Sequence, residues 1–155
     1  MGAVTGIWQR LRSLLGGGRS EPLDPHRTDL VVVVSSFDDA EACSTVLDRG
    51  AMAAPQWIPD EEAVLRHHLE LPAGAVEEAA ALAGQDGYLP ALSAGGAAVP
   101  KGRAALVLQR VQILDALHCA QEKSRMVSLA QRLGGTALGW DALQPGERDP
   151  KITAD

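Results

Sequence analysis

The residues best suited to metal or acid–base chemistry are few and poorly placed for it. His67 and His68 are neighbours in a segment with strand-like alternation, so their side chains should point to opposite faces of a sheet and cannot bind one metal together. His118 and Cys119 are neighbours on an expected helix, where successive side chains diverge by about 100° and lack the i, i+4 spacing of helical metal pairs. We therefore predict structural roles for these residues, and no metal or cofactor site.

Two other segments have some features of reactive motifs. The acidic run at 60–62 (Asp-Glu-Glu) is typical of a solvated turn, because paired catalytic carboxylates need a pocket around them. Residues 96–102 (Gly-Ala-Ala-Val-Pro-Lys-Gly) combine glycine and lysine as a phosphate loop does. However, Lys101 is followed by glycine in place of serine or threonine, and Pro100 removes a backbone N–H. The sequence predicts no catalytic residue, and we expect that the protein is not an enzyme.

Length and charge narrow the class of protein. The chain has 155 residues, a length that suits one domain of ordinary size. Its net charge is −6. An acidic chain is a poor candidate for direct nucleic-acid binding, because that binding needs a basic surface. Residues 1–20 hold three arginines and no acidic residue, so only this end is suited to an anionic surface.

Cysteine content and hydropathy point to a compartment. Cys43 and Cys119 both fall in helical patterns, which indicates buried free thiols in a reducing environment. No apolar run approaches the ~18 residues that a membrane span needs. The richness in alanine, glycine and valine is typical of proteins from GC-rich bacterial genomes. We expect a bacterial, cytoplasmic protein, with peripheral membrane contact as an alternative.

Residues 1–15 carry an amphipathic helix pattern, and residues 16–29 have the composition of a flexible linker. A helix this short is not stable alone in water, so it must dock on something. Its own domain, a groove on a partner and a membrane surface all remain open. The candidate contact residues, besides Val4, are Ile7, Trp8, Leu11, Leu14 and Leu15.

The N-terminal part of the predicted domain is a strand followed by a helix, within residues 30–60. The β-branched run 30–34 is apolar on both faces and therefore predicts a central strand. Asp38, with Glu41 three residues later, predicts the start of a helix that ends at Gly50. Residues 51–58 are a candidate for a short irregular strand, which prolines at 55 and 59 would keep at the edge of a sheet or out of it.

Residues 63–144 predict two further strand–helix units. Segment 63–71 alternates as a half-buried strand, with Leu65, His67 and Leu69 on one face. A helix is expected at 74–85 and a short strand at 89–92. The strongest pattern is a strand at 104–113, a helix at 115–133 and a strand at 136–143. Asp115 is the expected N-cap of the helix, and Gly134 follows its last turn. The apolar face of the helix includes Met126 and excludes Glu122. Residues 145–155 form a polar tail that we expect to be disordered.

These elements define a fold class. The order strand, helix, strand, strand, helix, strand over residues 63–144 is that of a ferredoxin-like α+β fold, a four-stranded antiparallel sheet with two helices on one face. Residues 30–60 then add an extra strand–helix unit to a single domain spanning 30–144. A rival partition assigns the ferredoxin-like order to residues 30–92, and the sequence alone does not decide between them.

Two segments resemble the RraB family, the regulators of ribonuclease E activity of type B. The first is His67-His68-Leu69, followed by an Ala/Glu-rich helix that closes on Gly87-Tyr88. The second is Leu114-Asp115, followed by the run from Met126 through Leu-Gly-Gly to Gly139-Trp140-Asp141, with Ala-Leu at 137–138 where the family tends to show Tyr-Asp. The resemblance covers about residues 63–144 and leaves residues 1–60 outside.

The resemblance implies a non-catalytic, ferredoxin-like regulator that binds ribonuclease E or another degradosome component. An acidic domain is suited to docking on arginine-rich segments of a nuclease. Trp140, Asp141 and His67 are then candidate partner-binding residues, although a Trp on a last strand is more often a core residue. Two other classes remain open: a ferredoxin-like domain that senses a small ligand, and a membrane-associated adaptor held by residues 3–15. The sequence does not predict the oligomeric state.

Overall fold

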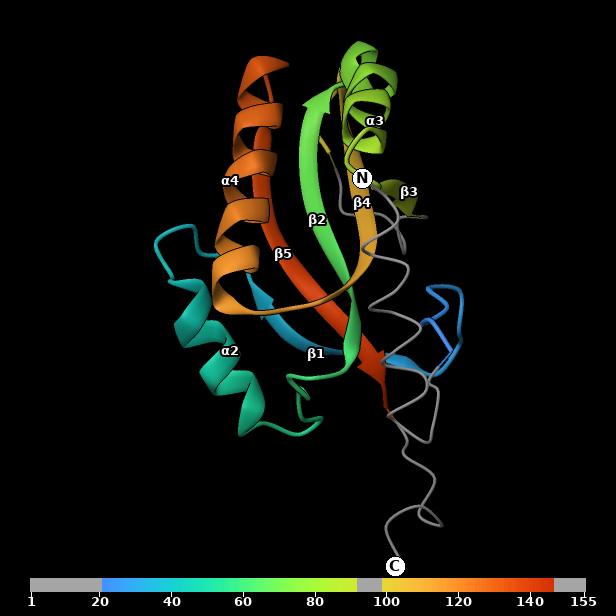
Figure 1. Ribbon diagram of the computed structural model, residues 1–155. Helices are drawn as coiled ribbons and strands as arrows, with labels where there is room; N and C mark the ends of the chain where they lie inside the picture. Colours follow the sequence, from blue (N-terminus) through green and yellow to red (C-terminus); the bar gives the residue numbers. More distant parts are fainter. Residues whose placement is uncertain (1–20, 92–98, 147–155) are drawn as a thin grey trace, which may run out of the picture.

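The computed structural model describes residues 21–91 and 99–146, which form a mixed α+β structure (Figure 1). Five strands form one antiparallel sheet in the order β1-β5-β2-β4-β3. The strands are β1 (Leu30–Ser36), β2 (Glu62–Pro72), β3 (Leu89–Ala91), β4 (Arg103–Ile113) and β5 (Thr136–Pro145). The helices are α2 (Cys43–Ala51), α3 (Val76–Gly84) and α4 (Ala116–Arg132), and a 3₁₀ turn (Ala73–Ala75) precedes α3.

The α+β prediction is confirmed, and the sheet has one strand more than a simple four-stranded ferredoxin-like sheet because β1 joins it beside β5. The three helices pack against one face, here called the inner face (Figure 1). The helices cover this face because the period-2 alternation of β2 makes it the apolar one. Leu65 and Leu69 are 0% and 1% exposed and point to the helices. The other face is here called the outer face.

The prediction for α4 is largely confirmed. Asp115 is its N-cap, and the carboxylate accepts a hydrogen bond from the backbone N–H of His118 at 2.8 Å. Gly134 follows the helix with φ +78°, a conformation that a Cβ atom disfavours. Met126 is buried as expected, but Glu122, expected off the buried face, is only 6% exposed. Glu122 is buried because polar partners reach it from the sheet, as described below.

The prediction that residues 30–34 form a central strand is wrong. Among the described strands, β1 pairs only with β5 and so lies at an edge of the sheet. The pairing register shifts between Val32 and Val34, and both Val33 and Val34 are buried toward the helix side. A bulge that turns two successive residues inward produces the continuous apolar run that would otherwise indicate a central strand.

The start predicted for the next helix is also wrong. α2 begins at Cys43, and its N-cap, Ala42, makes no side-chain capping bond. Asp38 instead accepts a hydrogen bond from the backbone N–H of Ala40 at 3.0 Å. Glu41 accepts from Ser36 Oγ at 2.8 Å and forms an ion pair with Arg49 at 2.6 Å. Asp38 and Glu41 therefore have the spacing of a capping box but do not cap α2. Glu41 instead links Ser36 of β1 to Arg49 of α2.

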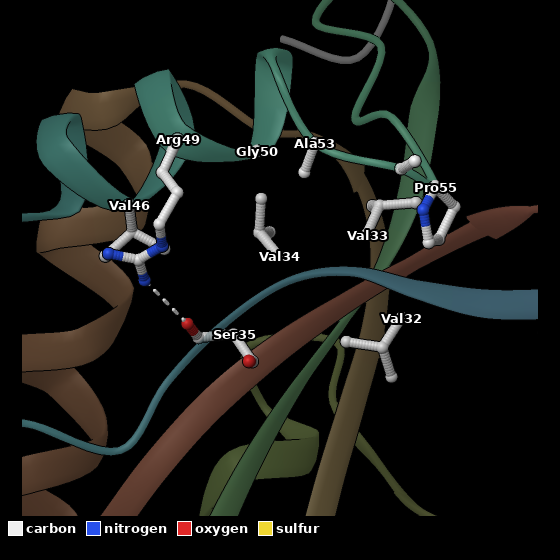
Figure 2. Close-up of a pocket in the computed structure, with 10 residues that line it drawn as sticks. Val32, Val33, Val34, Ser35, Val46, Arg49, Gly50, Ala53 and Pro55 are labelled. Carbon is white, nitrogen blue, oxygen red and sulfur yellow. Dashed lines mark hydrogen bonds between the residues drawn. The ribbon is translucent and has the colours of Figure 1, made fainter.

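Gly50 lies inside α2, although the sequence predicted it as the residue that ends the helix. It brings α2 close to β1, and Figure 2 shows Val34 directed toward the helix beside Gly50. A Cβ atom at Gly50 would lie 2.1 Å from Val34 Cγ1 and 3.3 Å from the carbonyl oxygen of Val33. The glycine is needed for close packing of helix on strand.

We expect Gly50→Ala to lower the free energy of unfolding by about 1–3 kcal/mol, because a buried, β-branched valine has little freedom to move away. Urea titration monitored by circular dichroism measures the change. Gly84→Ala is the matched control, because a Cβ at Gly84 meets no atom of the described residues within 4 Å. Equal stability of the two variants would contradict this account of the packing.

Candidate functional site

The two segments that carry the RraB resemblance meet in the middle of the sheet. β2 and β5 are paired so that His67 lies opposite Trp140, His68 opposite Gly139, and Arg66 opposite Asp141. These residues are more than seventy positions apart along the chain, and no sequence pattern predicts which of them face one another. Because side chains alternate along a strand, the site has an outer side and an inner side.

An ion-pair network lies on the outer side. Arg66 donates two hydrogen bonds to the carboxylate of Asp141, both at 2.7 Å, in the bidentate geometry that favours arginine. His68 Nε2 lies 3.1 Å from the same carboxylate. Burial alone would raise the pKa of the Asp141 carboxyl, but the hydrogen bonds from His68 and Arg66 hold this pKa below its usual range. Asp141 therefore stays ionised and fixes the side chains of Arg66 and His68 on β2.

Phe37 completes the outer side. Its ring centroid lies 5.3 Å from that of His68, with the planes tilted by 57°, and 58% of the residue is exposed. The phenylalanine is seated over Gly139, where a Cβ atom would lie 2.4 Å from Phe37 Cδ1 and 2.6 Å from the carbonyl oxygen of Ser36. The glycine of the Gly-Trp pair thus leaves room for an exposed aromatic ring held in place by His68.

A buried polar cluster lies on the inner side. The Tyr88 hydroxyl donates to Glu122 Oε2 at 2.7 Å and lies 3.4 Å from His67 Nε2. Glu122 also forms ion pairs with Arg110 at 3.2 Å and Arg125 at 3.3 Å. The Arg110 guanidinium lies 4.6 Å from the centre of the Tyr88 ring, a cation–π distance. These contacts join α4 to β4 and to the loop before β3.

Burial controls the ionisation of this inner cluster. It lowers the pKa of His67 to about 4, even though the charge of Glu122 favours protonation. It also raises the pKa of the Tyr88 hydroxyl, which the hydrogen bond to Glu122 raises further. At neutral pH His67 is therefore uncharged and Tyr88 keeps its proton. The cluster stabilises the core through the contacts that these groups and the two arginines make around Glu122.

All three predicted partner-binding residues are buried. Trp140 is 1% exposed, His67 3% and Asp141 4%, so none of these side chains reaches a partner in this conformation. Trp140 fills the core, and among the described residues its indole N–H has no hydrogen-bond acceptor. The helix residues Ile7, Trp8, Leu11, Leu14 and Leu15 lie outside the described part of the chain.

The side chains that the site exposes were not among the predicted contact residues. The exposed side chains are Phe37, Arg66 and His68, of which the last two are about a quarter exposed. Phe37 is the chain's one phenylalanine and lies in a loop after a strand, a position where a large apolar residue is unusual. A single phenylalanine in a loop was the signal that the sequence offered. The position of Phe37 over Gly139 depends on strand pairing, which the sequence does not show.

Two hollows lie away from this site. One of about 250 Å³ lies between β1 and α2, where Arg49 donates a hydrogen bond to the Ser35 carbonyl at 3.2 Å (Figure 2). The other, of about 740 Å³, lies between the start of α2 and the neighbouring surface of α4, beside Lys123. The first is lined by no residue of the two segments that carry the family resemblance, and the second is lined by Val127 and Ser128 from one of them.

Comparisons with family models, with curated proteins and with solved structures found no match. Within residues 21–91 and 99–146, no helix is long and apolar enough to cross a membrane.

Proposed function

We propose that the protein is a non-catalytic regulator that acts by binding another protein through the outer side of the β2–β5 pair. The observation that carries this proposal is the exposed Phe37 ring, 58% accessible and held against His68 over Gly139. Aromatic and arginine side chains that are fixed before binding lose little conformational freedom in a complex and often dominate its affinity. Arg66 and His68, anchored on Asp141, supply the polar rim.

We further propose a ferredoxin-like unit for residues 62–145, with β1 added to its edge. The strand order β5-β2-β4-β3, together with α3 and α4 between strands, supports this assignment. The RraB resemblance gives the partner: ribonuclease E or another component of the degradosome. The net charge of −6 also suits an arginine-rich protein segment better than RNA.

The test is capture of a ribonuclease E from bacterial lysate on immobilised protein, followed by binding to the purified nuclease. We expect Phe37→Ser to weaken the affinity at least tenfold while the melting temperature stays within about 2 °C, because the ring is exposed and contributes little to the core. Leu117→Ser is the matched control, since Leu117 is 64% exposed on α4 and lies away from the site. Failure to bind any ribonuclease E with wild-type protein, or equal loss in both variants, would contradict the proposal.

A further inference from the structure

An apolar row crosses four strands on the outer face of the sheet. Val32 of β1 is paired with Leu143 of β5, Leu143 with Val64 of β2, and Val64 with Val111 of β4. Directly opposed residues share a face, so the four side chains form one continuous row, and Ile113 extends it by alternation along β4. Figure 2 shows Val32 pointing away from α2, on the opposite side of β1 from Val33 and Val34.

The ends of this row are accessible although its centre is covered. Val32 and Ile113 are 43% and 45% exposed, while Val64 is 1% exposed even though the described helices lie on the other face. Valine and isoleucine aligned across neighbouring strands make the kind of apolar surface that an amphipathic helix covers. The exposed ends of the row therefore offer apolar surface to an occupant that approaches from the outer face.

The described chain begins beside this row. The backbone N–H of Leu23 donates to Glu62 Oε1 at 3.2 Å, and Glu62 is paired with Ile113 at the end of the row. Residues 16–22 can span about 20 Å or more when extended, several times the ~5 Å between neighbouring strands. A segment N-terminal to residue 16 can therefore reach every position of the row.

We infer that residues 3–15 of the same chain dock as an amphipathic helix along the apolar row. Their apolar positions include Ile7, Trp8, Leu11 and Leu14 at helical spacing. A helix with these residues on one face can pack that face against the branched aliphatic side chains of the row. The charge is also complementary, because residues 1–20 hold three arginines and no acid, whereas Glu62 lies opposite Ile113 at the row's end. An intramolecular contact compensates for the low stability of so short a helix.

This docking places a helix beside the proposed partner-binding residues. Val64 and Arg66 are alternate outer-face residues of β2, and Leu143 and Asp141 are alternate outer-face residues of β5. A helix on the row therefore competes for space with a protein bound at Phe37 and His68. The regulatory consequence rests on the proposed function, whereas the docking itself does not.

Hydrogen exchange of the full-length protein, followed by mass spectrometry without partner or lipid, tests the docking. We expect the amides of residues 3–15 to exchange at least tenfold more slowly than those of a synthetic peptide of residues 1–20. Val32→Glu and Ile113→Glu change exposed ends of the row, so the domain should stay folded while this protection falls to the level of the peptide. Leu117→Glu, on α4, is the control and should leave the protection unchanged.

The other occupants give different results. Protection that disappears on dilution would assign the row to a second copy of the chain and overturn the inference. Exchange at the rate of the free peptide, whether or not anionic phosphatidylglycerol vesicles later slow it, would overturn it as well. Because the measurement uses no partner, these outcomes leave the proposed function to its own test.

Discussion

Trp140→Ala is expected to lower the free energy of unfolding by about 3–5 kcal/mol, the largest effect of any single change considered. Trp140 is 1% exposed in the core between β5, β2 and α2, and removing its ring leaves a cavity that a sheet centre cannot close. Urea unfolding followed by circular dichroism measures the loss. Reduced partner binding by this variant would therefore report a weakened domain and not a lost contact.

Trp140→Phe separates volume from hydrogen bonding. The indole N–H has no acceptor among the described residues, so the phenylalanine variant loses part of the ring but no hydrogen bond. We expect a cost of about 1–2 kcal/mol, well below that of alanine. A Trp140→Ala variant that loses less than about 1 kcal/mol while losing its partner would show that Trp140 is a surface anchor after all.

Acid is expected to destabilise the protein between about pH 6.5 and pH 4.5, through His67. Burial lowers the pKa of His67 from 6.5 to about 4, so in this window the unfolded chain binds a proton that the folded protein does not. Stability therefore rises with pH across the window, and the group's full contribution is present only above pH 6.5. The expected loss on going from pH 7.5 to pH 4.5 is about 2–3 kcal/mol.

Urea titrations at both pH values measure this loss, and His67→Gln is the control. Glutamine does not titrate, so the variant should lose the pH-dependent part of its stability across the window, whatever its stability at pH 7.5. Glu122 and Asp141 favour protonation of His67, whereas Arg110 and His68 oppose it together with burial. An identical pH dependence in the wild type and in His67→Gln would show that another group is responsible.

The success of the sequence predictions depended on how local each signal is. The alternation of β2, the Asp115 cap and Gly134 after α4 are set by neighbours along the chain, and all three were predicted correctly. β1 was misplaced because a bulge and a central strand produce the same apolar run. Glu41 resembled part of a capping box, but its ion pair with Arg49 depends on how α2 returns to β1.

The candidate site was predicted in parts but not as a whole. Periodicity indicated that His67 and His68 point to opposite faces, and the structure agrees: one contacts Tyr88 and the other Asp141. Trp140 lies in the core, the position that the sequence favoured for a Trp on a last strand, whereas the burial of Asp141 depends on which strand lies beside β5. The pairing of β2 with β5 links positions far apart in sequence, so a single sequence carried no signal for Phe37 over Gly139.

The most direct test of the central claim is a map of the protein surface covered by the bound partner. Backbone amide chemical shifts of the isotope-labelled protein, recorded with and without the purified nuclease, would give this map. We expect the largest changes on Phe37, on residues 66–68 of β2 and on residues 139–141 of β5, while the exposed surface of α4 around Leu117 changes little. Changes concentrated in the groove between α2 and α4, with the β2–β5 pair unaffected, would contradict it.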